Sequence, residues 1–357
     1  MKIKEITWEK VRAAMEPFTI AFATIDAAEI MIVKVTTDDG IVGYGEASPF
    51  SPVTGETIDS VDAFLKAVKP GLIGMDPFAI ERIHAGMDHA FTGNGAAKCA
   101  VDLAMYDIMG KAAGQPVWKM IGGYRSEIEN DTTIGIMKPE EMAAQAVHFV
   151  KDCGYRILKV KVGIDPDADI RALRLIREAV GPDVRLRVDA NQGYDVEEAV
   201  YALEGFKKAG VDAAEQCLPW WDRAHMAELK RKVSGIRIML DEAVHDEKDA
   251  AALLAGGCAD ILNIKLMKCG GILPGLKIAD VAGAFGATCM VGCMMESRLA
   301  ITAGLSLIAS RACASEADCD SYYIFDDAKA GITGGFVEAN GVARLSDEPG
   351  FGVSIGF

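Results

Sequence analysis

Five short apolar runs between residues 157 and 265 each end in charged side chains, and these side chains are the ones best suited to chemistry. They are Lys159 and Lys161 in ILKVKV, Asp189 in RLRVDAN, Glu215 in VDAAEQ, Asp241 in IRIMLDE and Lys265 in DILNIK. Three carboxylates form an oxygen-rich ligand set that suits a hard divalent cation such as Mg²⁺. Because unpaired acids would repel one another, we expect a metal site with a lysine on either side of it.

The spacing of these charged ends predicts the fold that brings them together. From Lys161 onward they recur at steps of 28, 26, 26 and 24 residues, and each step has room for one strand, one helix and two short loops. Eight such units close into a barrel whose working face carries the C-terminal strand ends. Further strand-like runs at 132–136, 288–297 and 312–322 complete the eight. We therefore predict an α/β protein with a modified TIM barrel of the (β/α)7β type.

The segments outside the barrel repeats predict a second structural unit. Runs of alternating apolar and polar residues predict antiparallel strands near the N-terminus, and helical spacing follows them. The segments 17–28 and 48–56 have no clean periodicity, so we expect them to be mobile loops that cover the site. The expected divisions are an α+β capping domain at 1–124, the barrel at 125–330 and a C-terminal segment at 331–357 that returns to the cap.

The composition narrows the class of partner. The 357 residues carry a net charge of −15, which disfavours nucleic acid and anionic membrane surfaces. No apolar run approaches the roughly 18 residues of a membrane span, and the N-terminus lacks the apolar core of a signal peptide. Nine scattered cysteines without a C-x-x-C pair are typical of reduced, packed thiols. We expect a soluble, cytoplasmic protein.

The strand phase of the lysines favours a role at the barrel mouth. Lys159 and Lys161 lie two positions apart and so share one face of their strand. A K-x-K strand is often a solvated edge, but strands of a parallel repeat are covered on both faces. Lys265 ends its run where the acids end theirs, although Lys268 just beyond it is a rival for the same role.

Two further polar residues lie next to the predicted metal ligands in the sequence. Glu242 follows a predicted ligand and points to the other side of the strand, so we expect it to orient a lysine; Asn191, in DAN, is expected to support its neighbours in the same way. Other chemistries have little support, because the sequence contains no H-x-x-x-H pair, no G-x-S-x-G elbow and no Walker loop.

The whole pattern resembles the enolase superfamily, and within it the muconate lactonising subgroup. The K-x-K strand, the acids at these intervals and the lysine of NIK carry the resemblance, which covers essentially the whole chain. Members of this superfamily use a Lys or His base with Mg²⁺. The TTIGI, KLMKCGG and MMES stretches are most similar to the dipeptide epimerases of the subgroup, and the resemblance further implies a homo-oligomer.

The resemblance implies an isomerase that moves a proton at the α-carbon of the C-terminal residue of an L,L-dipeptide and so gives the L,D-dipeptide. Lys161 and Lys265 are the implied acid and base, one on each side of the substrate. Lys159 is implied to stabilise the enolate. The implied cofactor is Mg²⁺, bound by the three acids.

The resemblance also suggests which residues bind the dipeptide. Asp318 and Asp320 form a D-x-D pair where the dipeptide epimerases hold the substrate's α-ammonium group. Thr133, Glu296 and Ser297 lie in the similar stretches and are expected to contact substrate.

The resemblance defines less well which side chain the second residue of the dipeptide carries. Ala-Glu epimerases place an arginine in the first mobile loop, where this chain has Ala23, so a glutamate-bearing substrate is disfavoured. Asp26 would pair with a lysine or arginine side chain, whereas Phe50, with Phe18 and Phe22, would line an apolar pocket. The sequence leaves a hydrophobic and a cationic second residue open.

Alternative functions share the same metal set and lysines. They are N-acylamino-acid racemisation, o-succinylbenzoate synthesis and muconate-type cycloisomerisation, whose substrates have no free ammonium group. Outside enzymes, the alternative is a protein that binds carboxylates without a metal.

Overall fold

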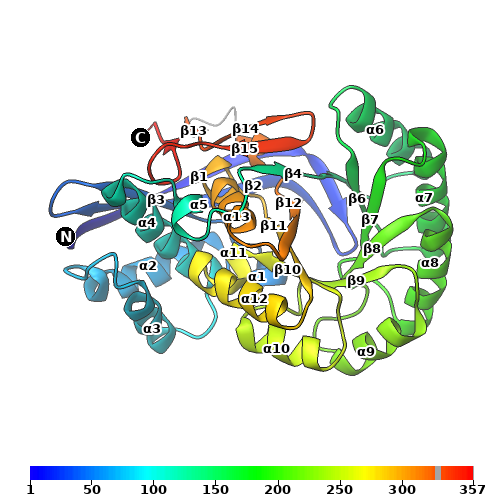
Figure 1. The fold of residues 1–357 in the computed structure, drawn as a ribbon, viewed down its shortest axis with the longest axis horizontal. Coiled ribbons are helices and arrows are strands. Elements are labelled where there is room, and N and C mark those ends of the chain that lie inside the picture. The colour runs from blue at the N-terminus through cyan, green and yellow to red at the C-terminus, as the bar shows by residue number, and fades with distance from the viewer. Residues whose placement is uncertain (326–330, 357) are drawn as a thin grey trace.

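The barrel predicted from the charged strand ends is present in the computed structural model, which describes residues 1–325 and 331–356 (Figure 1). Eight strands form one sheet in sequence order. They are β5 (Thr132–Ile134), β6 (Ile157–Lys161), β7 (Arg185–Asp189), β8 (Val211–Glu215), β9 (Arg237–Leu240), β10 (Ile261–Lys265), β11 (Thr288–Gly292) and β12 (Ala314–Asp318).

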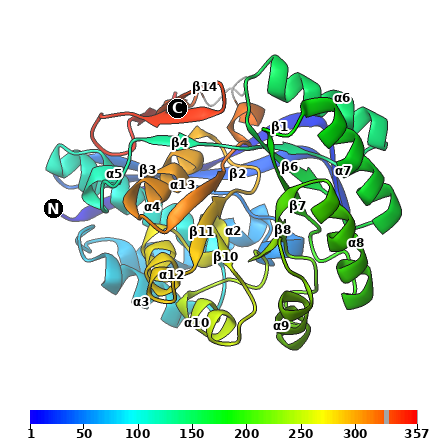
Figure 2. The same cartoon turned by 45° about the vertical axis from the view of Figure 1, so that its right-hand side comes forward.

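Helices follow these strands and cover the outside of the sheet (Figure 2). They are α6 (Pro139–Lys151), α7 (Pro166–Val180), α8 (Val196–Lys208), α9 (Arg223–Lys232), α10 (Glu247–Ala255), α11 (Leu266–Cys269), α12 (Ile272–Ala284) and α13 (Arg298–Ser310). Aspartates just before four of these helices accept hydrogen bonds from first-turn N–H groups and so fix where each helix starts; they are Asp165, Asp195, Asp222 and Asp246. The predicted α/β barrel is confirmed.

A cap of strands and helices lies against the barrel. Its three-stranded antiparallel sheet contains β1 (Ile3–Ile20), β2 (Ala23–Thr37) and β3 (Val42–Ala47). Its helices are α1 (Ser51–Thr54), α2 (Ile58–Leu72), α3 (Ile80–Ala90), α4 (Gly95–Ala113) and α5 (Val117–Met120). Helix α4 is buried along most of its length, as its Ala- and Met-rich sequence predicts.

The C-terminal segment packs beside the cap, as expected. It follows the 3₁₀ helix η1 (Tyr322–Phe325) and contains β13 (Thr333–Gly334), β14 (Phe336–Ala339), β15 (Val342–Leu345) and β16 (Val353–Ser354). Strand β15 pairs with β4 (Glu127–Glu129), and the Trp118 indole of α5 donates to the Ser346 carbonyl at 2.9 Å. The expected division of the chain near residues 124 and 330 stays a prediction, and residues 330 and 357 lie outside the described residues.

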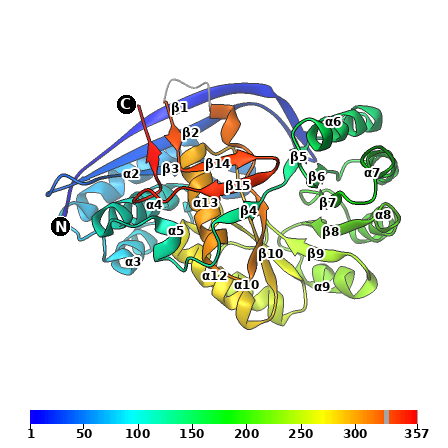
Figure 3. The same cartoon turned by 45° about the horizontal axis from the view of Figure 1, so that its top comes forward.

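The prediction that residues 17–28 form an irregular loop is wrong. They are the end of a long β1–β2 hairpin, in which Phe18 pairs with Ile25 and Ile20 with Ala23. The pairing shifts between Ala14 and Phe18, because Pro17 has no N–H to donate to the ladder and lies in the bulge. This bulge hid the alternation of the strand in the sequence. Figure 3 shows the hairpin reaching over the barrel toward β5, where the Ile136 N–H donates to the Thr19 carbonyl at 2.8 Å.

The barrel has a seam between its first and last strands. Among the described residues no backbone ladder joins β5 to β12. The Asn130 side chain takes the place of one, because its amide donates to the Cys319 carbonyl and accepts from the Cys319 N–H, both at 3.0 Å. Asp320 adds a third link by accepting from the Thr133 N–H at 2.8 Å.

The described part of the chain contains no helix that combines the length and the apolar character needed to span a membrane.

Close packing of α4 on β3 makes the cap sensitive to volume at Gly45. A methyl group there would overlap the Ala100 carbonyl of α4, so Gly45→Ala should lower the free energy of unfolding by about 3 kcal/mol. Urea unfolding followed by circular dichroism measures this.

Gly71→Ala is the matched control. Gly71 lies inside α2 with open space around the added atom, and alanine is a better helix former by about 0.5–1 kcal/mol. Equal destabilisation by both substitutions would contradict the packing argument.

Candidate active site

The C-terminal ends of β6 to β10 bring the predicted metal and lysine residues to one mouth. Asp189 ends β7, Glu215 ends β8 and Asp241 follows β9, and none of the three is more than 1% exposed. Lys161 ends β6 and Lys265 ends β10. Since β6 and β10 are separated by three strands in the eight-stranded barrel, the two lysines approach from opposite sides.

Lys159 is the centre of the ion pairs at this mouth. Its ammonium group lies 3.0 Å from Asp189, 2.9 Å from Glu215 and 2.7 Å from Asp318. Lys161 lies 2.6 Å from Asp189. Lys159 therefore links the predicted metal ligands to the predicted ammonium site.

The buried charges shift one another's pKa values in opposite directions. Burial raises the pKa of a carboxyl group, yet Lys159, Lys161 and Lys265 hold the pKa of Asp189 below its usual range. Burial together with the charge of Asp189 raises the pKa of Glu215 to about 7.

Lys265 is held in its charged form by an acid. Burial favours neutral lysine, but Asp241 at 2.9 Å outweighs burial and raises the pKa of Lys265. A general base must be neutral. Lys265 can therefore act as a base only when another cation compensates Asp241.

The three acids fit a hard metal ion. Both carboxylate oxygens of Asp241, and Oε2 of Glu215, are buried and accept no well-aligned side-chain hydrogen bond. The ammonium groups of Lys159, Lys265 and Lys268 lie 2.6 to 2.9 Å from these oxygens. Lys159 lies between Asp189 and Glu215. A second group of three acids is packed more tightly than the predicted metal ligands. Among the described residues, it is Asp131, Asp318 and Asp320 whose carboxylate oxygens all lie within 4.8 Å of one another.

Three residues hold the predicted metal ligands in place, and sequence reasoning missed two of them, Gln216 and Asn263. Gln216 accepts from the backbone N–H of Asp241 at 2.9 Å, and Asn263 donates to Glu215 at 2.6 Å. Lys268, the rival to Lys265, is turned to the side and lies 2.6 Å from Asp241 Oδ1. Asn263 could have been found, because it lies two positions before Lys265 on the same strand face; the positive φ of Gln216, 33°, has no signature in the sequence.

Asn191 and Glu242 lie beside Lys161, and the supporting role expected of them stays a prediction. Asn191 accepts from Lys161 at 3.1 Å and donates to Glu242 at 3.3 Å. Burial and the neighbouring Asp241 raise the pKa of Glu242 to about 8. Glu242 thus reaches Lys161 through the amide of Asn191.

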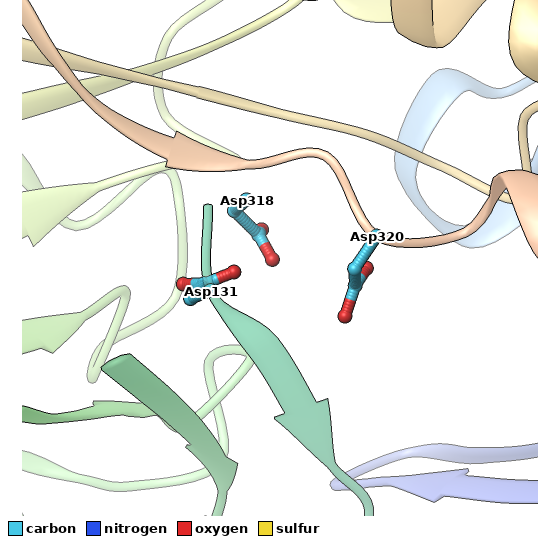
Figure 4. A group of neighbouring side chains, drawn as sticks. All are labelled: Asp131, Asp318 and Asp320. Carbon is cyan, nitrogen blue, oxygen red and sulfur yellow. The ribbon is translucent and has the colours of Figure 1, made fainter. Parts of the chain in front are cut away.

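The predicted ammonium site lies at the barrel seam. Asp318 and Asp320 line the cavity with Thr133, whose hydroxyl lies 3.4 Å from Asp318 and whose N–H donates to Asp320. Asp131, which the sequence analysis missed, faces them from the start of β5 (Figure 4). Burial and the charge of Asp318 raise the pKa of Asp320 to about 6.

An apolar wall faces the acids and lysines across a cavity of about 100 Å³. Phe50, expected in a pocket, does line it and stacks on Phe22 at 6.3 Å between ring centroids. The other main contributors are Met15, Phe18, Ile20, Ile25, Val53, Met295 and Ile324. Asp26 does not take part, because it is exposed on the opposite face of β2 from Ile25.

Glu296 and Ser297 do not line the cavity, although substrate contact was predicted for both. Ser297 caps α13 and bonds to the buried Glu46 of β3. Glu296 is 2% exposed and accepts from the Met294 N–H at 2.8 Å. Ser297 therefore joins the barrel to the cap, whereas the Glu296 N–H donates to the Ser321 hydroxyl at 2.9 Å. The predicted contact with substrate has no support from the position of either residue.

The fold and the mouth together define a class of protein. A (β/α) barrel whose successive strand ends carry K-x-K, Asp, Glu, Asp and Lys, covered by an α+β cap, has the architecture of an enolase-type enzyme. The family models agree with this class. "Mandelate racemase / muconate lactonizing enzyme, N-terminal domain" matches residues 2–122, and "Enolase C-terminal domain-like" matches residues 141–356. The chain belongs to this family.

Individual relatives are similar over their full length. The hydrophobic dipeptide epimerase of Enterococcus faecalis is 40% identical, over 99% of this chain and 100% of the relative. Its crystal structure with Mg and L-Leu-L-Tyr superposes with a TM-score of 0.95 at 38% identity, covering 99% and 100% of the two chains. The N-succinyl Arg/Lys racemase of Bacillus cereus gives a TM-score of 0.95 at 35% identity, covering 100% and 96%. The predicted resemblance to dipeptide epimerases is confirmed.

The proposed metal ligands are tested by Asp241→Asn. Removing one of three charged oxygen ligands should weaken Mg²⁺ binding by at least about tenfold, measured by isothermal titration calorimetry at neutral pH.

Asp212→Asn provides the control. Asp212 lies at the opposite end of β8 from Glu215, where it pairs with Arg185 and Arg237, and its loss should leave Mg²⁺ affinity within about twofold. Unchanged affinity in Asp241→Asn would rule that residue out as a ligand.

Proposed function

We propose that this protein is a Mg²⁺-dependent dipeptide epimerase that inverts the α-carbon of the C-terminal residue of an L,L-dipeptide whose second side chain is apolar. One observation carries the proposal. A single cavity combines an acid pair at the barrel seam, two lysines on opposite sides and an apolar wall. A dipeptide offers a matching ammonium group, an acidic α-carbon and a side chain.

The two lysines perform the proton transfer. Lys161 and Lys265 project from strands on opposite sides of the barrel, so each faces a different side of a carbon held between them. One removes the proton and the other supplies a proton to the opposite face. Inversion follows from this placement.

Mg²⁺ would be held by Asp189, Glu215 and Asp241, and when bound it supplies positive charge beside the substrate carboxylate, which makes the adjacent C–H more acidic. Lys159 faces the same region and adds a positive charge where negative charge develops on the substrate. Asn191 and Glu242 orient Lys161.

The acid pair favours a dipeptide over an N-acylamino acid. Asp318 and Asp320 line the cavity at the seam, where they attract a primary ammonium group and repel a succinyl carboxylate. Racemisation of N-acylamino acids remains the main alternative, since a racemase of that kind shares this fold.

The apolar wall favours a hydrophobic second residue over a cationic one. Ile25 and Phe22 face the cavity, whereas Asp26, the residue available to bind a lysine or arginine side chain, faces solvent. Burial of apolar area contributes about 25 cal/mol per Å². Self-association and a cytoplasmic location stay predictions.

The reaction is tested with a panel of L,L-dipeptides in D₂O in the presence of Mg²⁺. We expect gain of one deuteron at the α-carbon of the C-terminal residue together with the L,D-product, fastest for apolar second residues. Mass spectrometry and chiral chromatography measure both.

Lys161→Ala is the control for this panel, and it should reduce epimerisation at least about 100-fold. Exchange of N-succinyl amino acids without exchange of any dipeptide would overturn the proposal in favour of the racemase alternative.

The apolar wall is tested by a pair of neighbouring substitutions in β2. Ile25→Asp should lower kcat/KM for dipeptides with apolar second residues by about tenfold and raise it for those ending in lysine or arginine, because it places a carboxylate in the wall.

Asp26→Asn, on the opposite face, should change neither value by more than about twofold. An equal loss in both variants would mean that the hairpin acts through its stability and not through contact with substrate.

A further inference from the structure

Asp131 lies directly behind the acid pair at the seam. It precedes β5, is 0% exposed, and neither of its carboxylate oxygens has a hydrogen-bond partner. One of its oxygens lies within 4.8 Å of oxygens of Asp318 and Asp320. Figure 4 shows the side chains of Asp131 and Asp318 converging, with Asp320 facing them from the loop beyond β12.

Few groups compensate a negative charge on Asp131. Among the residues that the structure describes, the only cation within ion-pair distance is Arg187 of β7, at 3.1 Å. Arg187 is shared, because it also lies 2.5 Å from Glu316 of β12 and donates to the Ala317 carbonyl at 3.2 Å. Lys159 of β6 is engaged with Asp318 and with two predicted metal ligands.

Three carboxylates this close cannot all be ionised without a large cost in free energy. The Asp318 carboxylate forms an ion pair with Lys159 at 2.7 Å and lies 3.4 Å from the Thr133 hydroxyl. Asp320 borders the cavity and accepts from the Thr133 N–H. Asp131 is the deepest of the three and lacks any hydrogen bond. Burial and the charge of Asp318 raise its pKa well above the usual range.

We infer that Asp131 is a positioning residue of the ammonium site, which carries a proton with its hydroxyl directed at the Asp318 carboxylate. This inference rests on the proposed function and assigns a residue to it. The proton keeps the site at two negative charges, while the O–H group supports Asp318 from behind. Asp318 and Asp320 then face the ammonium group as carboxylates, and Asp131 does not touch the substrate.

Two substitutions separate a protonated from an ionised Asp131. Asparagine is neutral and can donate from the same position, so Asp131→Asn should keep KM for a dipeptide such as L-Leu-L-Tyr within about threefold of wild type. Alanine removes the donor, so Asp131→Ala should raise KM at least tenfold with kcat little changed. A merely structural role would instead lower the amount of folded enzyme and leave KM unaltered.

Infrared spectroscopy provides a readout without substrate. The difference spectrum between wild type and Asp131→Asn at pH 7 should contain a carboxylic-acid C=O band that shifts in D₂O. The matched control is Asp212→Asn, an acid-to-amide change at the other end of the barrel, which should not remove this band.

The outcomes are distinct from those that test the reaction. If Asp131→Asn raises KM as much as Asp131→Ala does, or if no acid band is lost, Asp131 is ionised and the inference is overturned. If wild type turns over no dipeptide while the band is present, the proposed function fails and the protonated Asp131 stands. Should Asp131→Ala not fold, Asp131→Asn and the infrared band still decide the question.

Discussion

The closure of the barrel between β5 and β12 is the constraint on which the rest of the site depends. Backbone ladders join all the other neighbouring strands, but at this seam side chains make the connection. The Asn130 amide bonds both backbone groups of Cys319, which is the pattern that a paired strand residue would provide. Because β5 has only three residues, a short strand and a few polar side chains hold the mouth in its closed shape.

Charge balance is the second organising feature, and it follows from that closure. A closed barrel forces inward-pointing side chains at the strand ends into a space with little water, where charges must be paired. Lys159 meets this requirement for acids from three strands at once. Farther down the barrel, Arg187 does the same between Asp131 and Glu316. Each cation bridges acids that would otherwise repel each other across the interior.

The sequence was sufficient to predict the barrel and its charged mouth, because one residue per repeat recurs at a regular interval and the carboxyl ends of parallel strands meet at one edge. It was insufficient where contacts cross between distant segments. The bulge at Pro17 broke the alternation of β1, so a paired hairpin was mistaken for a loop.

Side-chain direction was the other limit of the sequence. Ser297 was expected at the substrate, yet it bonds to Glu46, 251 residues away in the sequence, a contact with no local signature. Asp131 was missed for the same reason, because its importance comes from neighbours on β7 and β12. The same bulge also prevented the sequence from showing that Asp26 lies on the exposed face of β2.

The two ends of the proposed dipeptide site rest on very different parts of the molecule, and this has an evolutionary consequence. The acids at the seam also take part in closing the barrel, since Asp320 bonds the β5 backbone directly. Substitution there changes recognition and architecture together, so selection can rarely alter it. The apolar wall is built in large part from the β1–β2 hairpin outside the barrel sheet, where a side chain can be exchanged while every barrel ladder stays intact. Divergence in this fold is therefore expected to be fast for the second side chain and slow for the amino end.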